Sequence, residues 1–547
     1  MGHASEPKNL VDMLLRRADS HGDETLYRYL ETGDVDGPIT TMSYNDLLRR
    51  AKAVGALLQR LGGAGERAML LYPPGLDFMA GIYGCFFSGT IAVPTFSPDP
   101  TQKERLLKRF AVILADARPR FVLTTRAFAE MAPAMMHGID AAADVRWITT
   151  DDLDESLADE WTHPVFDGDP LALLQYTSGS TSAPKGVMVS HANLIDNQQR
   201  MADVSALGPG YNTVYWLPLF HDLGLLCGVI VPVCQAHVCT LMSPVVFLQK
   251  PVRWLQAVSH FRATATAGPN FAFGLVTRKV TDDEIASLDL SSLLMCGNGA
   301  EPVTGSTLRM FIDRFVPAGL RPHCLSPMYG LAEATLMVTA TASEAPYVSV
   351  FLSGEELKRG KVEVVAPDHP DAKELMCLGR PGEGIEILIV NPDTLTRAAP
   401  DEVGEIWVQS PEVGRGYWNK PEETARGFSA RLSDTHKGPY LRTGDLGFLH
   451  EGMVCLTGRH KDLLIVRGAN FYPQDIEATV EHSSRHVRPG CVAAFTLAAD
   501  KEEHLVVCAE AKTPGEHGPS LADIARGIRV AVAEAHGVHV HAVALLA

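Results

Sequence analysis

Alternating helix and strand patterns through most of the chain restrict its fold more than any other feature. Residues 43–62 place apolar side chains at helical spacing behind Ser43, a residue type that often caps helix N-termini. Short apolar runs at 67–72, 90–94, 120–125 and 171–176 predict strands, and 78–89 predicts a packed helix. This alternation predicts an α/β fold whose parallel sheets are covered by helices.

The pattern changes from about residue 379, where short strands alternate with turn residues. Three such strands are predicted at 385–390, 404–409 and 453–458. The length of 547 residues also exceeds what one hydrophobic core usually supports. We therefore expect a large N-terminal domain, residues 1–459, and a smaller domain over 460–547.

Composition argues against several classes of partner, although local basic patches remain possible. The formal net charge of -17 argues against a protein that wraps nucleic acid or lies on an anionic membrane. The N-terminus has no apolar signal core, and the longest apolar run, 223–234, is interrupted by Pro232 and is too short for a bilayer. We expect a cytoplasmic protein with no nucleic-acid partner and no membrane span.

The ten cysteines contain no CxxC pair. The group that most resembles a metal-binding cluster consists of Cys234, His237 and Cys239. Buried free thiols in a reducing compartment are the simpler explanation for them.

Residues 176–186, YTSGSTSAPKG, have the composition of a phosphate-binding loop. Glycines allow the backbone to approach an oxyanion closely, and small hydroxyls can donate hydrogen bonds to it. The loop is not a Walker motif, because Pro184 rather than glycine precedes Lys185. By itself it could equally be a polar surface turn.

Four segments in order resemble motifs of the adenylate-forming superfamily, which includes acyl-CoA synthetases, luciferases and peptide-synthetase adenylation domains. They are TSGSTSAPKGVMVSH at 177–191, MYGLAEAT at 328–335, YLRTGDLGF at 440–448, and GRHKDLLIVRGANFYPQDIE at 458–477. The resemblance implies that superfamily's fold, with packed sheets and helices in a large N-terminal domain and a small α+β C-terminal domain.

The resemblance also implies a reaction in which a carboxylate attacks the α-phosphorus of ATP to give an acyl-adenylate and pyrophosphate. A carboxylate is already ionised at neutral pH, so the demands are positioning and charge neutralisation. Glu333 is implied to hold Mg²⁺, Tyr329 to stack on adenine, Asp445 to bind the ribose hydroxyls, and Arg459 to reach ribose or phosphate. The remaining implied ATP contacts are Thr177, Ser178, Gly179, Ser180, Thr181, Lys185, Gly299, Ala300, Glu301, Met328, Gly330 and Leu331.

Ordinary structural roles stay open for three of these residues. Asp445 could cap a turn, Glu333 could begin a helix, and Lys185 could be a solvated loop lysine. The sequence also departs from the superfamily's usual pattern, with Ser182 in place of glycine and Ala332 in place of threonine. Whether the hydroxyl of Thr335 replaces the one lost at position 332 is left open.

The acid-binding side is predicted from two stretches. WLPLFHDLGLL, 216–226, places His221, Asp222 and Gly224 in an apolar setting, and the resemblance puts His221 beside the substrate carboxylate. A core histidine with satisfied hydrogen bonds is the alternative. Phe271 and Phe273 in 268–279 suit an acyl tunnel or ordinary helix packing equally well. No aspartate stands out to bind an ammonium group, which weakens an amino-acid-activating function.

The chain most resembles fatty acyl-AMP ligases, and the resemblance covers essentially its whole length. The segments that carry it are LQYTSGST, WLPLFHDLGL, SPVVFLQKPVRWLQ, GPNFAF and YGLAEAT. These enzymes load fatty acids for polyketide, lipopeptide and lipid synthesis. Residues 347–376 resemble the insertion that marks this branch, although an ordinary surface loop is the alternative. The insertion is thought to restrain motion at a hinge, here Lys461 and Asp462, so that the phosphopantetheine thiol of an acyl carrier protein replaces CoA as acceptor.

The chain ends at HGVHVHAVALLA, where the superfamily's terminal lysine loop would follow, and no lysine occurs after Lys512. We expect a shortened chain that binds ATP and forms the adenylate slowly, because a charge-neutralising cation is lost. His221, Glu333, Lys185 and Arg459 are the expected catalytic residues, with ATP and Mg²⁺ required. An acyl-CoA synthetase and a catalytically weak acyl-adenylate-binding module remain the alternatives.

Overall fold

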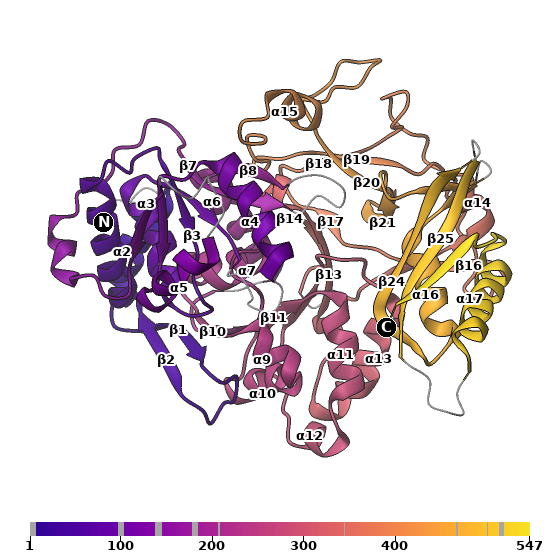
Figure 1. The fold of residues 1–547 in the computed structure, drawn as a ribbon, viewed down its shortest axis with the longest axis horizontal. Helices are drawn as coiled ribbons and strands as arrows, with labels where there is room; N and C mark the ends of the chain where they lie inside the picture. Colours follow the sequence, from indigo (N-terminus) through magenta and orange to yellow (C-terminus); the bar gives the residue numbers. More distant parts are fainter. Residues whose placement is uncertain are drawn as a thin grey trace.

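The computed structural model describes residues 7–96, 103–136, 145–177, 184–205, 208–343, 345–466, 469–499, 502–512 and 519–546. Figure 1 shows two packed sheets with helices at the N-terminal end and a smaller body at the C-terminal end. The α/β class predicted from the sequence is confirmed, and the helix predicted at 43–62 is α2, capped by the Ser43 side chain. The longer helices are α1 (Leu10–His21), α2 (Tyr44–Arg60), α3 (Asp77–Ser88), α4 (Lys103–Ala117), α5 (Arg126–Met136), α6 (His191–Ser205), α10 (Val252–His260), α11 (Asn270–Lys279), α13 (Gly305–Phe315), α15 (Pro421–Phe428), α16 (Pro473–Ser483) and α17 (Leu521–His536).

One sheet contains the two strands that flank the predicted phosphate loop. Its order is β6-β5-β3-β4-β7-β8, with all neighbours parallel except the last pair. The predicted strands at 67–72, 90–94, 120–125 and 171–176 are confirmed as members of it. The bounds are β3 (Arg67–Leu70), β4 (Ile91–Pro94), β5 (Phe121–Thr124), β6 (Arg146–Thr149), β7 (Leu171–Thr177) and β8 (Lys185–Ser190).

The second large sheet, in the described part of the chain, has the order β17-β14-β13-β12-β11-β9-β10-β1-β2. It is parallel from β13 to β1 and antiparallel at both ends. Its strands are β1 (Thr25–Leu30), β2 (Ile39–Ser43), β9 (Asn212–Tyr215), β10 (Val238–Met242), β11 (Ala265–Gly268), β12 (Met295–Asn298), β13 (Leu325–Gly330), β14 (Met337–Ala340) and β17 (Arg380–Pro381). The short helices beside it are α7 (Asp222–Leu225), α8 (Val231–Gln235), α9 (Pro244–Gln249) and α12 (Asp282–Ala286).

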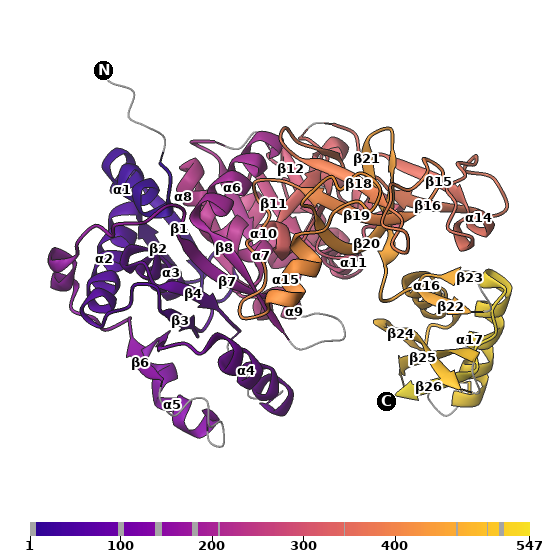
Figure 2. The ribbon, with the colours of Figure 1, turned by 90° about the horizontal axis from the view of Figure 1, so that it is seen from above.

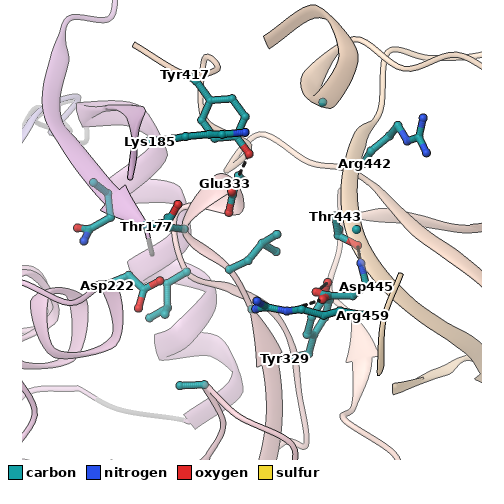
Figure 3. A pocket seen from close by; sticks show the side chains of 18 of the residues that line it. Thr177, Lys185, Asp222, Tyr329, Glu333, Tyr417, Arg442, Thr443, Asp445 and Arg459 are labelled. Carbon is teal, nitrogen blue, oxygen red and sulfur yellow. Dashed lines mark hydrogen bonds and ion pairs between the residues drawn. The ribbon is translucent and has the colours of Figure 1, made fainter. Parts of the chain in front are cut away.

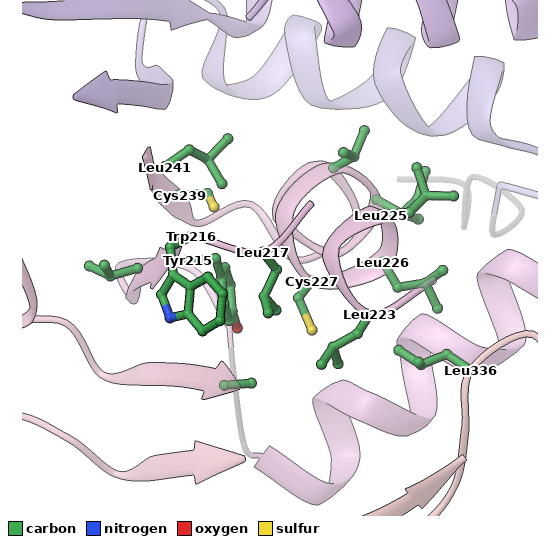
Figure 4. Packing of buried hydrophobic residues seen from close by; sticks show 14 of the residues in the cluster. Tyr215, Trp216, Leu217, Leu223, Leu225, Leu226, Cys227, Cys239, Leu241 and Leu336 are labelled. Atoms are coloured by element: carbon green, nitrogen blue, oxygen red, sulfur yellow. The ribbon is translucent and has the colours of Figure 1, made fainter. Parts of the chain in front are cut away.

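The apolar run at 223–234 lies in the core rather than in any membrane segment. It forms α7, a π-helical turn over Leu226–Ile230, and α8, and its leucines pack beside Tyr215, Cys239 and Leu241 (Figure 4). Cys234 and Cys239 are buried free thiols. Across the described residues there is no group of three or more potential metal ligands and no helix long and apolar enough to cross a bilayer.

An antiparallel sheet leads from the large domain to the C-terminal body. Its strands β18 (Glu386–Val390), β19 (Gly404–Gln409), β20 (Leu441–His450) and β21 (Met453–Arg459) pair in sequence order. Beyond Lys461, α16 and α17 pack on a separate hydrophobic cluster with β22 (Leu464–Val466), β23 (Ala469–Phe471), β24 (Val487–Ala499), β25 (Glu502–Ala511) and β26 (Ala542–Leu546).

Residues 347–376, which could have been a plain loop, form a folded hairpin. β15 (Ser349–Ser353) pairs antiparallel with β16 (Ala372–Met376), and α14 (Gly354–Lys358) follows β15. Figures 1 and 2 both place this hairpin beside the C-terminal body.

Candidate active site

A cavity of 740 Å³ brings most of the predicted site residues together (Figure 3). The ends of β7 and β8, the segment after β13, and β20 and β21 all contribute to its lining. The predicted residues that line it are Thr177, Lys185, His221, Asp222, Ala300, Met328, Tyr329, Gly330, Leu331, Glu333, Asp445, Arg459 and Lys461. Ser178, Gly179, Ser180 and Thr181 lie outside the described residues.

One end of the cavity contains a carboxylate and a lysine held by a common tyrosine. Tyr417 donates a hydrogen bond to Glu333 Oε1 at 2.7 Å. Lys185 Nζ lies 4.8 Å from the centre of the Tyr417 ring and forms an ion pair with Glu423 of α15. Burial raises the pKa of Glu333, whereas the Lys185 hydrogen bond lowers the pKa of Glu423. The Glu333 carboxylate and the Lys185 ammonium therefore both line this end of the cavity.

The chemistry of this end fits a bound Mg²⁺. Within the described residues, Glu333 forms no ion pair with a lysine, arginine or histidine, although burying a carboxylate charge without a cation is costly. A hard divalent cation prefers carboxylate and phosphate oxygens and would compensate that charge. Glu333 is the residue that would hold it.

The other end of the cavity is organised around Asp445. Tyr329 donates to Asp445 Oδ2 at 2.8 Å, and Arg459 Nε lies 3.3 Å from Oδ1. Burial raises the pKa of Asp445, and the Arg459 charge opposes that rise. Asp445 on β20 and Arg459 on β21 are direct partners in the strand register. Asp445 is thus a buried acceptor with a fixed orientation.

Glu405 of β19, which the sequence did not indicate, supports this end. It is buried, accepts from Arg442 Nε at 2.9 Å, and accepts from the backbone N–H of Gly444 at 3.1 Å. Thr443 donates to the carbonyl of Ile406 at 2.7 Å. The turn that precedes Asp445 is therefore attached to β19 at several points.

His221 and Asp222 stand at the third side of the cavity. His221 Nδ1 lies 2.6 Å from Asp222 Oδ1, and the Asp222 charge raises the pKa of His221. The imidazole is 54% exposed, so it is not the buried core histidine of the alternative interpretation. Gly224 does not line the cavity. A Cβ there would stand 2.1 Å from the Pro218 carbonyl oxygen, so its glycine permits a close backbone contact.

Four further predicted residues do not line the cavity. Phe273 is fully buried against Trp254 and Phe311, which is the helix-packing alternative, and Phe271 is 45% exposed on the same helix. Glu301 accepts a hydrogen bond from the backbone of Phe271. Gly299 packs against Met328, which does line the cavity. An apolar helix repeat does not tell a tunnel wall from core packing, which is why both phenylalanines were candidates.

Thr335 does not replace the hydroxyl that Ala332 lacks. It is buried and donates to the carbonyl of Glu412 at 2.6 Å. Asp462 of the predicted hinge is likewise absent from the cavity lining, whereas Lys461 is part of it.

Tyr417 and Glu423 are, like Glu405, lining residues that the sequence reasoning missed. Gly416, with φ +114°, and Pro421 at the start of α15 mark a turn followed by a helix. Those signals locate a loop but not the direction of the tyrosine side chain.

Comparisons with known proteins find one matching family and several similar ligases. The AMP-binding enzyme family matches residues 14–418. The medium-chain-fatty-acid–[acyl-carrier-protein] ligase JamA of Moorena producens is 39% identical over 99% of this chain and 92% of its own length. The long-chain-fatty-acid–AMP ligase FadD26 of Mycobacterium bovis is 36% identical over 97% of this chain and 92% of its own. The structure of a fatty acyl-adenylate ligase from L. pneumophila, in complex with acyl adenylate and pyrophosphate, has 36% identity and a TM-score of 0.80, covering 99% and 93% of the two chains.

Proposed function

We infer the function of this chain from its family: the chain belongs to the AMP-binding enzymes and, within them, to the fatty acyl-AMP ligases. It activates a fatty acid with ATP to an acyl-adenylate and passes the acyl group to the phosphopantetheine thiol of an acyl carrier protein. The observation that carries this proposal is one cavity that has Glu333 at one end, Asp445 at the other and His221 at a third side.

In the first step a carboxylate oxygen of the fatty acid attacks the α-phosphorus of ATP. The new O–P bond forms as the bond to the β-phosphate breaks, and pyrophosphate leaves with the electron pair. Lys185 and the hydroxyl-bearing loop that begins at Thr177 bind the departing phosphates, and Glu333 would hold Mg²⁺. When bound, Mg²⁺ neutralises charge on the phosphate oxygens.

The nucleoside is held at the opposite end. Asp445 accepts hydrogen bonds from the ribose hydroxyls, Tyr329 and Ala300 lie against adenine, and Arg459 reaches the ribose or the α-phosphate. Strand pairing fixes the backbones of Asp445 and Arg459 relative to each other, which helps the two side chains to orient the nucleotide. His221, whose pKa Asp222 raises, attracts the carboxylate of the acid at the third side.

The hairpin at 347–376 supports an acyl carrier protein as acceptor. Lys373 of β16 forms an ion pair with Asp475 of α16, and Lys358 of α14 donates to the carbonyl of His536 at 3.1 Å. On its other side, Glu374 receives two hydrogen bonds from Arg309 of α13, at 2.6 and 2.8 Å. The hairpin therefore connects the large domain to the C-terminal body and opposes rotation at Lys461.

Fatty-acid-dependent formation of acyl-AMP tests the first step. The protein would be incubated with ATP, Mg²⁺ and a series of fatty acids of increasing chain length, and acyl-AMP and pyrophosphate measured. We expect equal amounts of both products and a clear chain-length preference. Pyrophosphate release that does not depend on the acid, or no acyl-AMP with any acid, would overturn the proposal.

A further inference from the structure

Backbone hydrogen bonds join the segment that carries Tyr417 to β8, which begins at Lys185, and to Glu333. Arg415 N donates to the carbonyl of Met188, Met188 N donates to that of Gly416, and Trp418 N donates to that of Gly186, at 2.9, 2.9 and 2.8 Å. These bonds add the segment to β8, whose first residue is Lys185. Gly414 N donates to the backbone carbonyl of Glu333 at 2.9 Å. The backbone thus fixes Tyr417 relative to Lys185 and Glu333 together.

The Tyr417 side chain contacts both of these residues at once. Its hydroxyl donates to Glu333 Oε1 at 2.7 Å, and its ring lies under the Lys185 ammonium at 4.8 Å (Figure 3). The Phe428 ring stands edge-on to it at 5.1 Å. A hydroxyl bonded to one carboxylate oxygen stops the carboxylate from rotating freely. In the described structure the other oxygen, Oε2, receives no hydrogen bond from another residue.

We propose that Tyr417 is a positioning residue for adenylation: its hydroxyl fixes Glu333 so that Oε2 is free for the divalent cation of ATP, and its ring keeps Lys185 on the same side. This inference rests on the proposed function, because it assigns the roles of Glu333 and Lys185 within it. A single side chain then sets the relative placement of the carboxylate and the ammonium that act on the polyphosphate. The Lys185–Glu423 ion pair holds the ammonium from its other side.

The matched comparison is Tyr440, which does not line the cavity and whose hydroxyl donates to Glu386 Oε2 at 2.9 Å. Tyr417→Phe and Tyr440→Phe each remove one tyrosine-to-carboxylate hydrogen bond and keep the ring. Both are expected to keep the thermal unfolding midpoint within a few degrees of wild type. Only Tyr417→Phe changes the carboxylate in the cavity.

The test is a calorimetric titration of ATP at increasing Mg²⁺ concentrations, repeated with Mn²⁺ and followed by paramagnetic resonance of the bound ion. For Tyr417→Phe we expect the metal concentration at half-maximal binding to rise about tenfold, the size of effect that loss of a hydrogen bond to a charged group gives. ATP binding without metal, and the metal dependence of Tyr440→Phe, are expected to match wild type.

Two results would overturn the inference in distinguishable ways. Wild-type protein that binds ATP with Mg²⁺, together with an unchanged metal midpoint in Tyr417→Phe, overturns the positioning role and leaves the proposed function standing. Wild-type protein that binds no ATP with either metal overturns the proposed function and this inference with it.

Discussion

Asp445 and Arg459 face each other across the β20–β21 pair, with Arg459 Nε 3.3 Å from Asp445 Oδ1. The strand that ends at Arg459 leads within two residues to Lys461, which also lines the cavity. The end of the cavity at which we propose that the nucleotide binds therefore lies at the junction between the large domain and the C-terminal body.

Replacing Asp445 by asparagine tests its proposed contact with the ribose. The change keeps the shape but removes the negative charge that pairs with Arg459 and accepts hydroxyl hydrogen bonds. Hydrogen bonds to charged groups contribute about 1.5–3 kcal/mol, so we expect KM for ATP to rise about 10- to 100-fold in a pyrophosphate-exchange assay. Asp289→Asn is the control, because Asp289 pairs with Arg262 at 3.2 Å on the surface. Equal effects of the two changes would contradict the assignment.

Replacing Glu405 by glutamine tests whether this buried carboxylate supports the Asp445 turn. Arg442 and the backbone of Gly444 would lose a charged acceptor. We expect a stability loss of about 1–3 kcal/mol in urea unfolding and a several-fold rise in KM for ATP. Glu386→Gln, on β18 of the same sheet, removes a more exposed pair with Lys437 at 2.6 Å and serves for comparison. Glu405→Gln protein with wild-type stability and KM would refute the supporting role.

Removing the contacts between the hairpin and the C-terminal body tests acceptor choice. In Lys358→Ala/Lys373→Ala the ion pair to Asp475 and the hydrogen bond to His536 are both lost. We expect the share of acyl groups passed to CoA to rise about 5- to 30-fold, since each of the two contacts contributes about 0.5–1 kcal/mol. Lys361→Ala is the control, because Lys361 lies in the same hairpin but pairs with Asp401 and Glu402. An acceptor ratio that stays the same in all variants would show that the hairpin does not restrain the body.

The pH dependence of fatty-acid binding tests the His221–Asp222 pair. Asp222 raises the pKa of His221, so the imidazole stays charged at pH values above the ordinary histidine pKa of about 6.5. The pair's contribution to stability is therefore complete below about pH 6.5 and is lost as the pH rises through the raised pKa. We expect KM for the fatty acid to rise over the same interval, and Asp222→Asn to move that rise to lower pH. A KM that does not vary between about pH 6 and pH 9 would argue against a charged His221 in binding.

Local patterns predicted much of the architecture, because helix caps and apolar periodicity act over short distances. Ser43 caps α2 as expected, and the apolar runs around 67–72 and 171–176 are strands. The cavity residues Glu333 and Asp445 were predicted by resemblance rather than by periodicity. Their roles stay predictions.

The parts that the sequence did not reveal depend on contacts between distant segments. Tyr417 and Glu333 are 84 positions apart, and nothing in the sequence of 404–409 indicates that Glu405 is buried within its strand. Phe273 belongs to an apolar helix whose periodicity is the same for a tunnel wall and for core packing. Only the three-dimensional arrangement separates these cases.

Competition between the two thiol acceptors tests the central claim most directly. Protein, ATP, Mg²⁺ and the preferred fatty acid would be mixed with equal concentrations of CoA and a phosphopantetheinylated acyl carrier protein, and the acyl products separated by mass. The account predicts that acyl-AMP forms first and that the acyl group then accumulates on the carrier protein rather than on CoA. Accumulation of acyl-CoA as the main product would contradict it.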